Sequence, residues 1–155
     1  MPNDPGKVKT SSVFVALVGR PNVGKSSLTN RLVGEKVAIV TQKPQTTRSR
    51  ITGILTRGPV QYVLMDTPGI HVPRNKLDAR MTQTAAASIK DVDVTVMLFE
   101  PSGPFTESEL KMIEALRQGG PALAVINKVD LLRDFSALEA RERELEALGV
   151  FEAVL

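Results

Sequence analysis

The sequence predicts an α/β fold, with helices on both faces of a mostly parallel sheet that has one antiparallel edge strand. Two observations support this prediction. Apolar runs rich in β-branched residues alternate with segments of helical periodicity over residues 12–155. The runs at 49–57 and 60–65 are separated only by a short turn around Gly58, which implies an antiparallel hairpin. Ligands of such folds bind at the carboxyl ends of the strands.

The polar residues 1–11 are expected to be a disordered leader, followed by one domain over residues 12–155. Within that domain Thr106 is placed to cap a helix. The polar stretch 36–48 has no clear period, as is usual for a functional or mobile loop. The expected strands are 13–18, 49–57, 60–65, 92–99, 122–126 and 150–155, and the expected helices are 25–33, 77–90, 107–117 and 136–148.

The composition is that of an ordinary globular domain. The chain has 155 residues, of which 42% are hydrophobic and 24% are charged. It contains no cysteine, so disulfides and zinc–thiolate sites within the chain are excluded. No apolar run reaches the length of a membrane span and no signal peptide is visible, which favours a cytoplasmic protein.

Charge is distributed unevenly along the chain. Residues 1–80 hold 13 Lys and Arg against 4 Asp and Glu, whereas residues 81–155 hold 7 against 13. The basic half would suit an anionic ligand or an RNA partner. A solvated basic face is an equally good interpretation, because the basic residues are scattered and few aromatic residues are available to stack on bases.

Residues 19–26 read Gly-Arg-Pro-Asn-Val-Gly-Lys-Ser, the complete G-x-x-x-x-G-K-S phosphate-binding pattern. The glycines let backbone N–H groups surround a phosphate, and the N-terminus of the following helix adds positive charge. Lys25 is expected to reach the β- and γ-phosphates, and the Ser26 hydroxyl is expected to bind Mg²⁺. A chance Gly-rich turn is the alternative, but the strand before this loop and the helix after it favour a nucleotide site.

Residues 66–69, Asp-Thr-Pro-Gly, follow the expected strand at 60–65. Asp66 could hold Mg²⁺ through water, and Gly69 could bring its N–H group to a γ-phosphate. In isolation this tetrapeptide would be interpreted as a β-turn. Its position downstream of a phosphate-binding loop favours the nucleotide interpretation.

Residues 127–130, Asn-Lys-Val-Asp, follow the expected strand at 122–126. The Asp130 carboxylate can accept both N1–H and the N2 amino group of guanine, whereas adenine would present a lone pair to it. The Lys128 stem can lie over the plane of the base. A helix N-cap at Asp130 or a polar turn is the alternative, and the presence of the other two motifs in order favours guanine recognition.

These three motifs in this order resemble the translation-factor-related GTPases, and their details resemble the Era family of bacterial GTPases. Gln-Thr-Thr-Arg-Ser-Arg at 45–50 and His71 after Asp-Thr-Pro-Gly-Ile separate this pattern from the related EngA and MnmE proteins. The resemblance covers residues 12–155. It implies a P-loop NTPase with a Ras-like G domain, which hydrolyses GTP as a molecular switch during assembly of the small ribosomal subunit.

The resemblance also implies roles for single residues. Thr47 would be the switch threonine that meets Mg²⁺ and the γ-phosphate, with Thr46 as the near alternative. Ile70 stands where Ras-like proteins carry a water-orienting glutamine, so slow intrinsic hydrolysis is expected. Asn22 would help to hold a potassium ion against the phosphates, and the alternative is that it only braces the loop. His71 is expected to have a switch-loop or packing role rather than that of a catalytic base.

The candidate residues fall into three sets. The candidate catalytic residues are Asn22, Lys25, Thr47 and Gly69, and the candidate Mg²⁺ ligands are Ser26, Thr47 and Asp66. The candidate nucleotide-binding residues are Gly19, Arg20, Pro21, Asn22, Val23, Gly24, Lys25, Ser26, Ser27, Asp66, Thr67, Pro68, Gly69, Ile70, Asn127, Lys128, Val129 and Asp130.

Members of the resembled family continue into a Ser-Ala loop that contacts guanine and then into a KH-type RNA-binding domain. The chain is therefore expected to be a G domain truncated before both, with contacts to ribosomal RNA made by the missing part. The resemblance further implies a monomer and peripheral association with the inner membrane.

Two alternatives to a GTP-hydrolysing switch remain open. The first is a nucleotide-gated binding module with negligible hydrolysis, which Ile70 keeps in consideration. The second is an ATP-dependent enzyme such as a small-molecule kinase. The Asn-Lys-Val-Asp motif and the absence of an Arg-rich lid-like insert argue against it.

Overall fold

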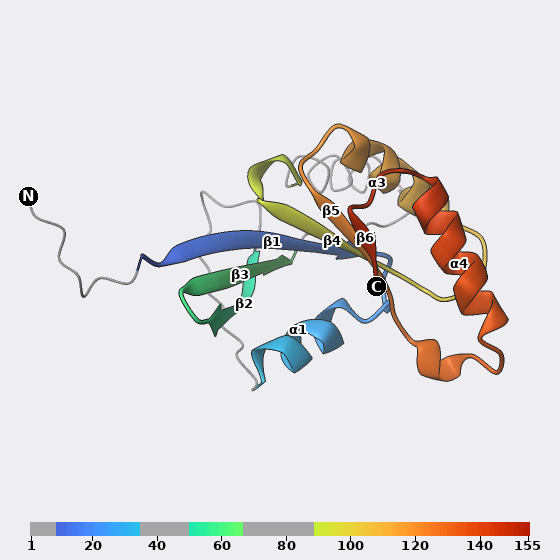
Figure 1. The fold of residues 1–155 in the computed structure, drawn as a ribbon, viewed down its shortest axis with the longest axis horizontal. Helices are drawn as coiled ribbons and strands as arrows, with labels where there is room; N and C mark the ends of the chain where they lie inside the picture. The colour runs from blue at the N-terminus through green and yellow to red at the C-terminus, as the bar shows by residue number, and fades with distance from the viewer. Residues whose placement is uncertain (1–8, 35–49, 67–88) are drawn as a thin grey trace, which may run out of the picture.

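The computed structural model describes residues 9–34, 50–66 and 89–155 (Figure 1). These residues form a six-stranded sheet in the order β2-β3-β1-β4-β5-β6. The strands are β1 (Ser11–Gly19), β2 (Arg50–Arg57), β3 (Val60–Asp66), β4 (Val94–Phe99), β5 (Ala122–Ile126) and β6 (Ala153–Val154). The helices are α1 (Lys25–Val33), α3 (Glu107–Arg117) and α4 (Ser136–Ala147), with 3-10 turns η1 (Ile89–Asp91) and η2 (Val129–Leu131).

The sheet has the predicted mixture of strand directions. β1 pairs in parallel with β3 on one side and with β4 on the other, and β5 and β6 continue the parallel arrangement. β2 is antiparallel to β3 and lies at the edge of the sheet. The prediction of a mostly parallel sheet with one antiparallel edge strand is therefore confirmed.

Two hydrophobic clusters lie on opposite faces of this sheet, because alternate residues of each strand belong to different clusters. Val18, Met97 and Phe99 pack with residues of α3 and α4, including Leu116 and Leu145. Leu28 of α1 packs instead with the residues that alternate with them in the strands, namely Leu17, Val96 and Leu98. Helices thus cover both faces, as Figure 1 also shows and as the sequence predicts.

The helix boundaries follow from their capping residues. α1 ends at Gly34, whose φ of 78° lets its N–H group bond the Asn30 carbonyl. α3 begins with a capping box, in which the Thr106 hydroxyl accepts the Glu109 N–H while the Glu109 carboxylate accepts the Thr106 N–H. Thr106 is therefore the cap that the sequence predicts. None of the helices within the described ranges is both long and apolar enough to cross a membrane.

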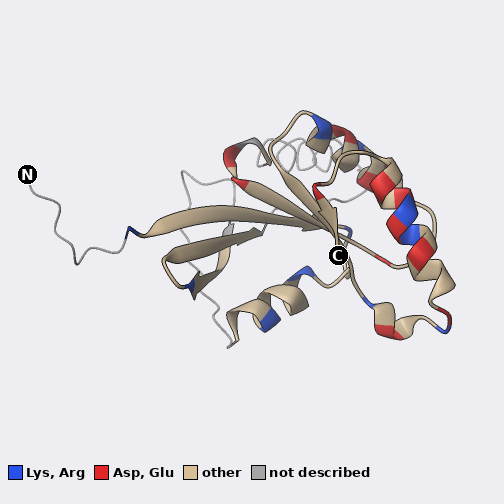
Figure 2. Cartoon of the chain, in the orientation of Figure 1, with Lys and Arg blue, Asp and Glu red and all other residues tan. Residues whose placement is uncertain are grey.

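Ion pairs between neighbouring turns account for much of the surface charge of α3 and α4 (Figure 2). They join Glu107 to Lys111 and Glu139 to Arg143, each four residues apart. Because both members of each pair are exposed, such pairs add little to stability. These charged side chains keep the outer faces of both helices in contact with water, and none of the four residues belongs to the candidate site.

Strand β2 contains an irregularity in its pairing with β3 that the sequence did not predict. Its register with β3 shifts between Ile51 and Gly53, so Thr52 is the additional residue of a bulge. The Thr52 hydroxyl donates to the Leu64 carbonyl at 3.2 Å. Beyond the bulge Gly53 lets α1 approach closely, since a Cβ at this position would lie 2.8 Å from Cγ2 of Val33.

Several predicted boundaries need correction. β1 starts at Ser11, one residue inside the expected leader, and residues 1–8 lie outside the described part of the chain. β4 starts at Val94 rather than at residue 92, because the Asp93 carboxylate accepts the Phe14 N–H at 2.8 Å and ends the ladder.

The expected helix at 77–90 and the expected strand at 150–155 also differ from the structure. Residues 77–88 of that helix lie outside the described residues, and its last positions form the 3-10 turn η1. Only Ala153 and Val154 pair as strand β6. Val150 and Phe151 instead turn their side chains onto the core cluster of Phe99.

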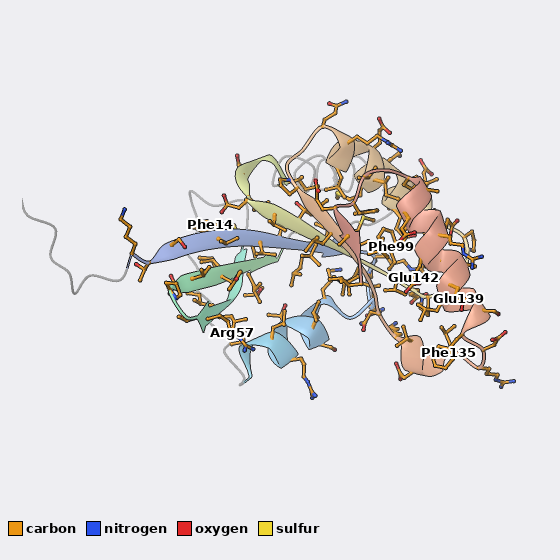
Figure 3. The ribbon with its side chains drawn as sticks, in the orientation of Figure 1. Phe14, Arg57, Phe99, Phe135, Glu139 and Glu142 are labelled. Carbon is orange, nitrogen blue, oxygen red and sulfur yellow. The ribbon has the colours of Figure 1, made fainter. Side chains whose placement is uncertain are left out.

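Phe99 is expected to be a major source of stability. Its side chain is 1% exposed and meets the rings of Phe105 and Phe151 edge to face, with centroids 5.7 Å apart in both pairs. Phe99→Ala should lower the free energy of unfolding by about 3–5 kcal/mol in urea titrations. Phe135 is the matched control because it is 69% exposed at the start of α4 (Figure 3), and Phe135→Ala should stay within about 0.5 kcal/mol of the parent. Equal losses would contradict this assignment of the core.

Candidate nucleotide-binding site

The Gly-rich loop that follows β1 is anchored in the core by one side chain. Val23 is fully buried and packs with Leu17 and Leu98, although it lies in the middle of the loop. Backbone angles on either side of it are unusual, with φ values of 62° at Asn22 and 110° at Gly24. The loop therefore has a fixed wrapped shape, which is the arrangement needed to direct N–H groups toward one point.

Lys25 is the first residue of α1 and turns its side chain back over the loop. Its Nζ donates to the Gly19 carbonyl at 2.9 Å and to the Arg20 carbonyl at 3.2 Å. Ser26 and Ser27 follow it in the first turn and are exposed. No acidic residue lies in this first turn, so the positive end of the helix and the lysine act together. The arrangement favours an anion in front of the loop.

The loop that follows β5 is joined to the Gly-rich loop by Asn127. Its Nδ2 donates to the Val23 carbonyl at 2.9 Å, across 104 residues of sequence. The contact is close enough to require glycine at position 24, since a Cβ there would lie 2.1 Å from the same Nδ2 atom. The structure thus brings the first and the third sequence motifs together at the carboxyl ends of β1 and β5.

Lys128 and Asp130 lie just beyond this junction. Lys128 is the N-cap of η2, with a φ of 60°, so the alternative that Asp130 caps a helix is wrong. Asp130 lies within the 3-10 turn and is exposed. Among the described residues, Asn22 and Lys128 are the only non-glycine residues with positive φ, and both belong to candidate site loops. Backbone strain of this kind is typical of functional sites.

The second motif is described only at its first residue. Asp66 ends β3 and pairs with Leu17 of β1, so its backbone lies beside the strand that leads into the Gly-rich loop. Its expected partner Ser26 provides a hydroxyl, and hydroxyl and carboxylate oxygens suit Mg²⁺. Within the described ranges no group of three or more acidic or histidine side chains could hold a metal ion. The remaining expected residues lie outside the described part of the chain, namely Thr46, Thr47, Thr67, Pro68, Gly69, Ile70 and His71.

Sequence reasoning missed two acidic residues at this site. Glu100, the first residue after β4, pairs through Oε2 with Arg20 at 2.8 Å and through Oε1 with Lys128 at 3.3 Å. Glu109 of α3 lies 3.8 Å from the same arginine. The Arg20 side chain therefore faces carboxylates, which leaves the backbone of Arg20 as its expected contribution to phosphate binding. Glu100 could have been found by the rule that picked out Asp66, since it too follows a buried strand.

The family described as 50S ribosome-binding GTPase matches residues 14–128. The chain belongs to this GTPase family. Among curated relatives, GTPase Era of Fusobacterium nucleatum is 42% identical over 144 residues, which are 92% of this chain and 49% of the relative. GTPase Era of Clostridium perfringens is 50% identical over 120 residues, which are 77% of this chain and 40% of the relative.

Solved structures agree with the sequence relatives. Era in complex with MgGDPNP and nucleotides 1506–1542 of 16S ribosomal RNA has a TM-score of 0.75 at 28% identity, covering 94% of this chain and 50% of that one. A variant of Aquifex aeolicus Era bound to GDP·AlF₄⁻ has a TM-score of 0.73 at 29% identity, covering 93% and 50%. The expected P-loop GTPase fold and the resemblance to Era are confirmed. The chain spans about half the length of these relatives.

The bond from Asn127 to Val23 should contribute measurably to stability. Asn127→Ala removes a half-buried donor and leaves the Val23 carbonyl without this partner, so the free energy of unfolding should fall by about 1–3 kcal/mol. The control is Asn30→Ala on the exposed surface of α1, which should change it by less than about 0.5 kcal/mol. Urea titration of both variants provides the measurement. A loss no larger than that of the control would show that the two loops are held by other contacts.

Proposed function

We propose that this chain is a GTP-binding and GTP-hydrolysing domain that acts as a molecular switch. The hydrogen bond between Asn127 and Val23 is the observation that carries the proposal. It joins a loop suited to phosphates to a motif suited to guanine, so that one nucleotide could contact both. The Era relatives solved with MgGDPNP and with GDP·AlF₄⁻ support the same ligand.

Phosphate binding would depend on the Gly-rich loop. Its N–H groups and the positive end of α1 would face the phosphates, and Lys25 would supply the principal cation. Ser26 and Asp66, with Thr47, would hold Mg²⁺ through oxygen ligands. When bound, that ion would neutralise charge between the β- and γ-phosphates.

Base selection would depend on the loop after β5. The Asp130 carboxylate is exposed in η2 and can accept two hydrogen bonds from guanine. Adenine offers no such pair of donors, so it would leave the carboxylate unsatisfied. This difference is why GTP is proposed as the substrate rather than ATP, and it disfavours the small-molecule kinase.

Hydrolysis would proceed without a water-orienting side chain at position 70, because isoleucine has no polar group. A slow intrinsic rate is therefore part of the proposal. Asn22 is exposed in the loop at positive φ and carries an amide oxygen that could bind a monovalent cation. A potassium ion there would stabilise charge that develops in the transition state.

The cellular role is proposed by analogy with the relatives. One Era structure contains nucleotides 1506–1542 of 16S ribosomal RNA. A role in assembly of the small ribosomal subunit would follow if the part of the relatives that this chain does not span makes similar contacts. A cytoplasmic monomer with peripheral inner-membrane association completes the proposal.

A nucleotide-gated binding module is the second candidate, favoured by the isoleucine at position 70. It would bind GTP and GDP with the same residues but would turn over negligibly. The two candidates share every binding prediction below and differ only in the rate of phosphate release.

Asp130→Asn tests the choice of base. The substitution replaces one of two acceptor atoms by a donor, so GDP affinity should fall roughly 100-fold, whereas xanthosine diphosphate should bind better than it does to the parent. Titration with both nucleotides measures the change. The control Asp91→Asn alters an exposed aspartate in η1 and should leave both affinities unchanged. Undiminished GDP binding by Asp130→Asn would refute guanine recognition by this residue.

Asn22→Gly tests the role of a monovalent cation. Glycine adopts the φ of 62° without strain, so the variant removes the amide but keeps the shape of the loop. In single-turnover assays potassium should accelerate GTP hydrolysis by the parent roughly tenfold or more over sodium. The variant should lose this acceleration and keep its GDP affinity. Equal parent rates in the two salts would rule out the potassium site, and undetectable phosphate release would favour the binding module.

A further inference from the structure

Glu100 lies at the carboxyl end of β4, in the middle of the sheet. It follows β4, whose parallel neighbour β1 leads into the Gly-rich loop, and the register pairs Gly19 with Leu98. After β1 the chain continues to β2 and β3, which lie on one side of this point in the sheet. After β4 it continues to β5, which lies on the other side. Between two such strands the loops diverge, which leaves room for a ligand. A side chain placed here can reach both halves of the candidate site.

The two carboxylate oxygens of Glu100 serve different loops. Oε2 accepts from Nη2 of Arg20 at 2.8 Å, in the Gly-rich loop, and Oε1 accepts from Nζ of Lys128 at 3.3 Å, in the guanine motif. The side chains of Arg20 and Glu100 are each 29% exposed, and that of Lys128 is 30% exposed. They are therefore only partly screened by water, and the shared carboxylate limits where each cation can lie.

Arg20 is in turn held from a second direction. Its Nη1 lies 3.8 Å from Oε2 of Glu109, a side chain that is 3% exposed. That oxygen accepts the Thr106 N–H at 2.7 Å and the Thr106 hydroxyl at 3.0 Å, so α3 fixes it in place. A chain of contacts therefore runs from the cap of α3 through Arg20 and Glu100 to Lys128.

We propose that Glu100 is a positioning residue for guanine nucleotides, which sets the Lys128 side chain over the base without touching the nucleotide itself. This inference rests on the proposed function. Lys128 has a long side chain on a strained backbone position, with a φ of 60°. Fixing its ammonium group before binding lowers the conformational entropy that is lost when the base arrives. Affinity for GDP then depends on a carboxylate that sequence motifs do not include.

A double-mutant cycle tests whether Glu100 acts through Lys128. The parent, Glu100→Gln, Lys128→Met and the double variant are titrated with GDP. Glu100→Gln should weaken GDP binding about 3- to 10-fold in the parent, as expected for a partly exposed ion pair. In the Lys128→Met background the same change should cost less than about 2-fold, because the group it positions is gone. The control Glu114→Gln removes an exposed pair with Arg117 and should not change GDP affinity.

Three results would each be decisive. Failure of the parent to bind GDP would overturn the proposed function together with this inference. A parent that binds GDP, with a loss on Glu100→Gln that persists in the Lys128→Met background, would overturn the inference alone. Tighter GDP binding by Glu100→Gln would show that Glu100 competes with the base for Lys128 and would also overturn it. If thermal melting shows that Glu100→Gln is unfolded, Glu100→Asp takes its place in the cycle, because it keeps the charge but cannot span both cations.

Discussion

The hydrogen bond from Asn127 to the Val23 carbonyl is the interaction on which the candidate site depends. It joins the loops after β1 and β5, which enter the site from strands separated in the sheet by β4. Val23 is itself buried between Leu17 and Leu98, so the bond attaches the β5 loop to the core rather than to a mobile surface segment. Glycine at position 24 lets the amide come this close. Both loops of the candidate site are therefore held in place by the packed core of the sheet.

The ion pairs around Glu100 extend this arrangement to a third strand and to α3. The β4 segment contributes the carboxylate, the Gly-rich loop contributes Arg20 and the β5 loop contributes Lys128. Each pair alone would be worth little, because all three side chains contact water. Their value lies in geometry, since one shared carboxylate relates the positions of two loops that would otherwise be set independently.

The sequence predicted the parts of this protein that depend on local pattern. Apolar periodicity located the strands and helices, and the three motifs were recognised because the residues of each motif are close together in the chain. The bulge at Thr52, the start of β4 and the short β6 were missed, since each depends on contacts with another strand. The position of Glu100 at the end of a strand was visible in the sequence, but its pairing with Arg20 was not, because the two residues are 80 positions apart.

The positive φ angles of Asn22 and Lys128 have a consequence for how such a chain would change under laboratory evolution. Glycine would relieve the strain at either position, so a screen that rewards thermal stability alone would favour it there. Each such gain would remove a side chain to which a role in the candidate site is assigned. Thermostable descendants selected without a nucleotide would therefore be expected to lose the proposed potassium response through Asn22 and nucleotide affinity through Lys128, while the sheet beneath the two loops became harder to unfold.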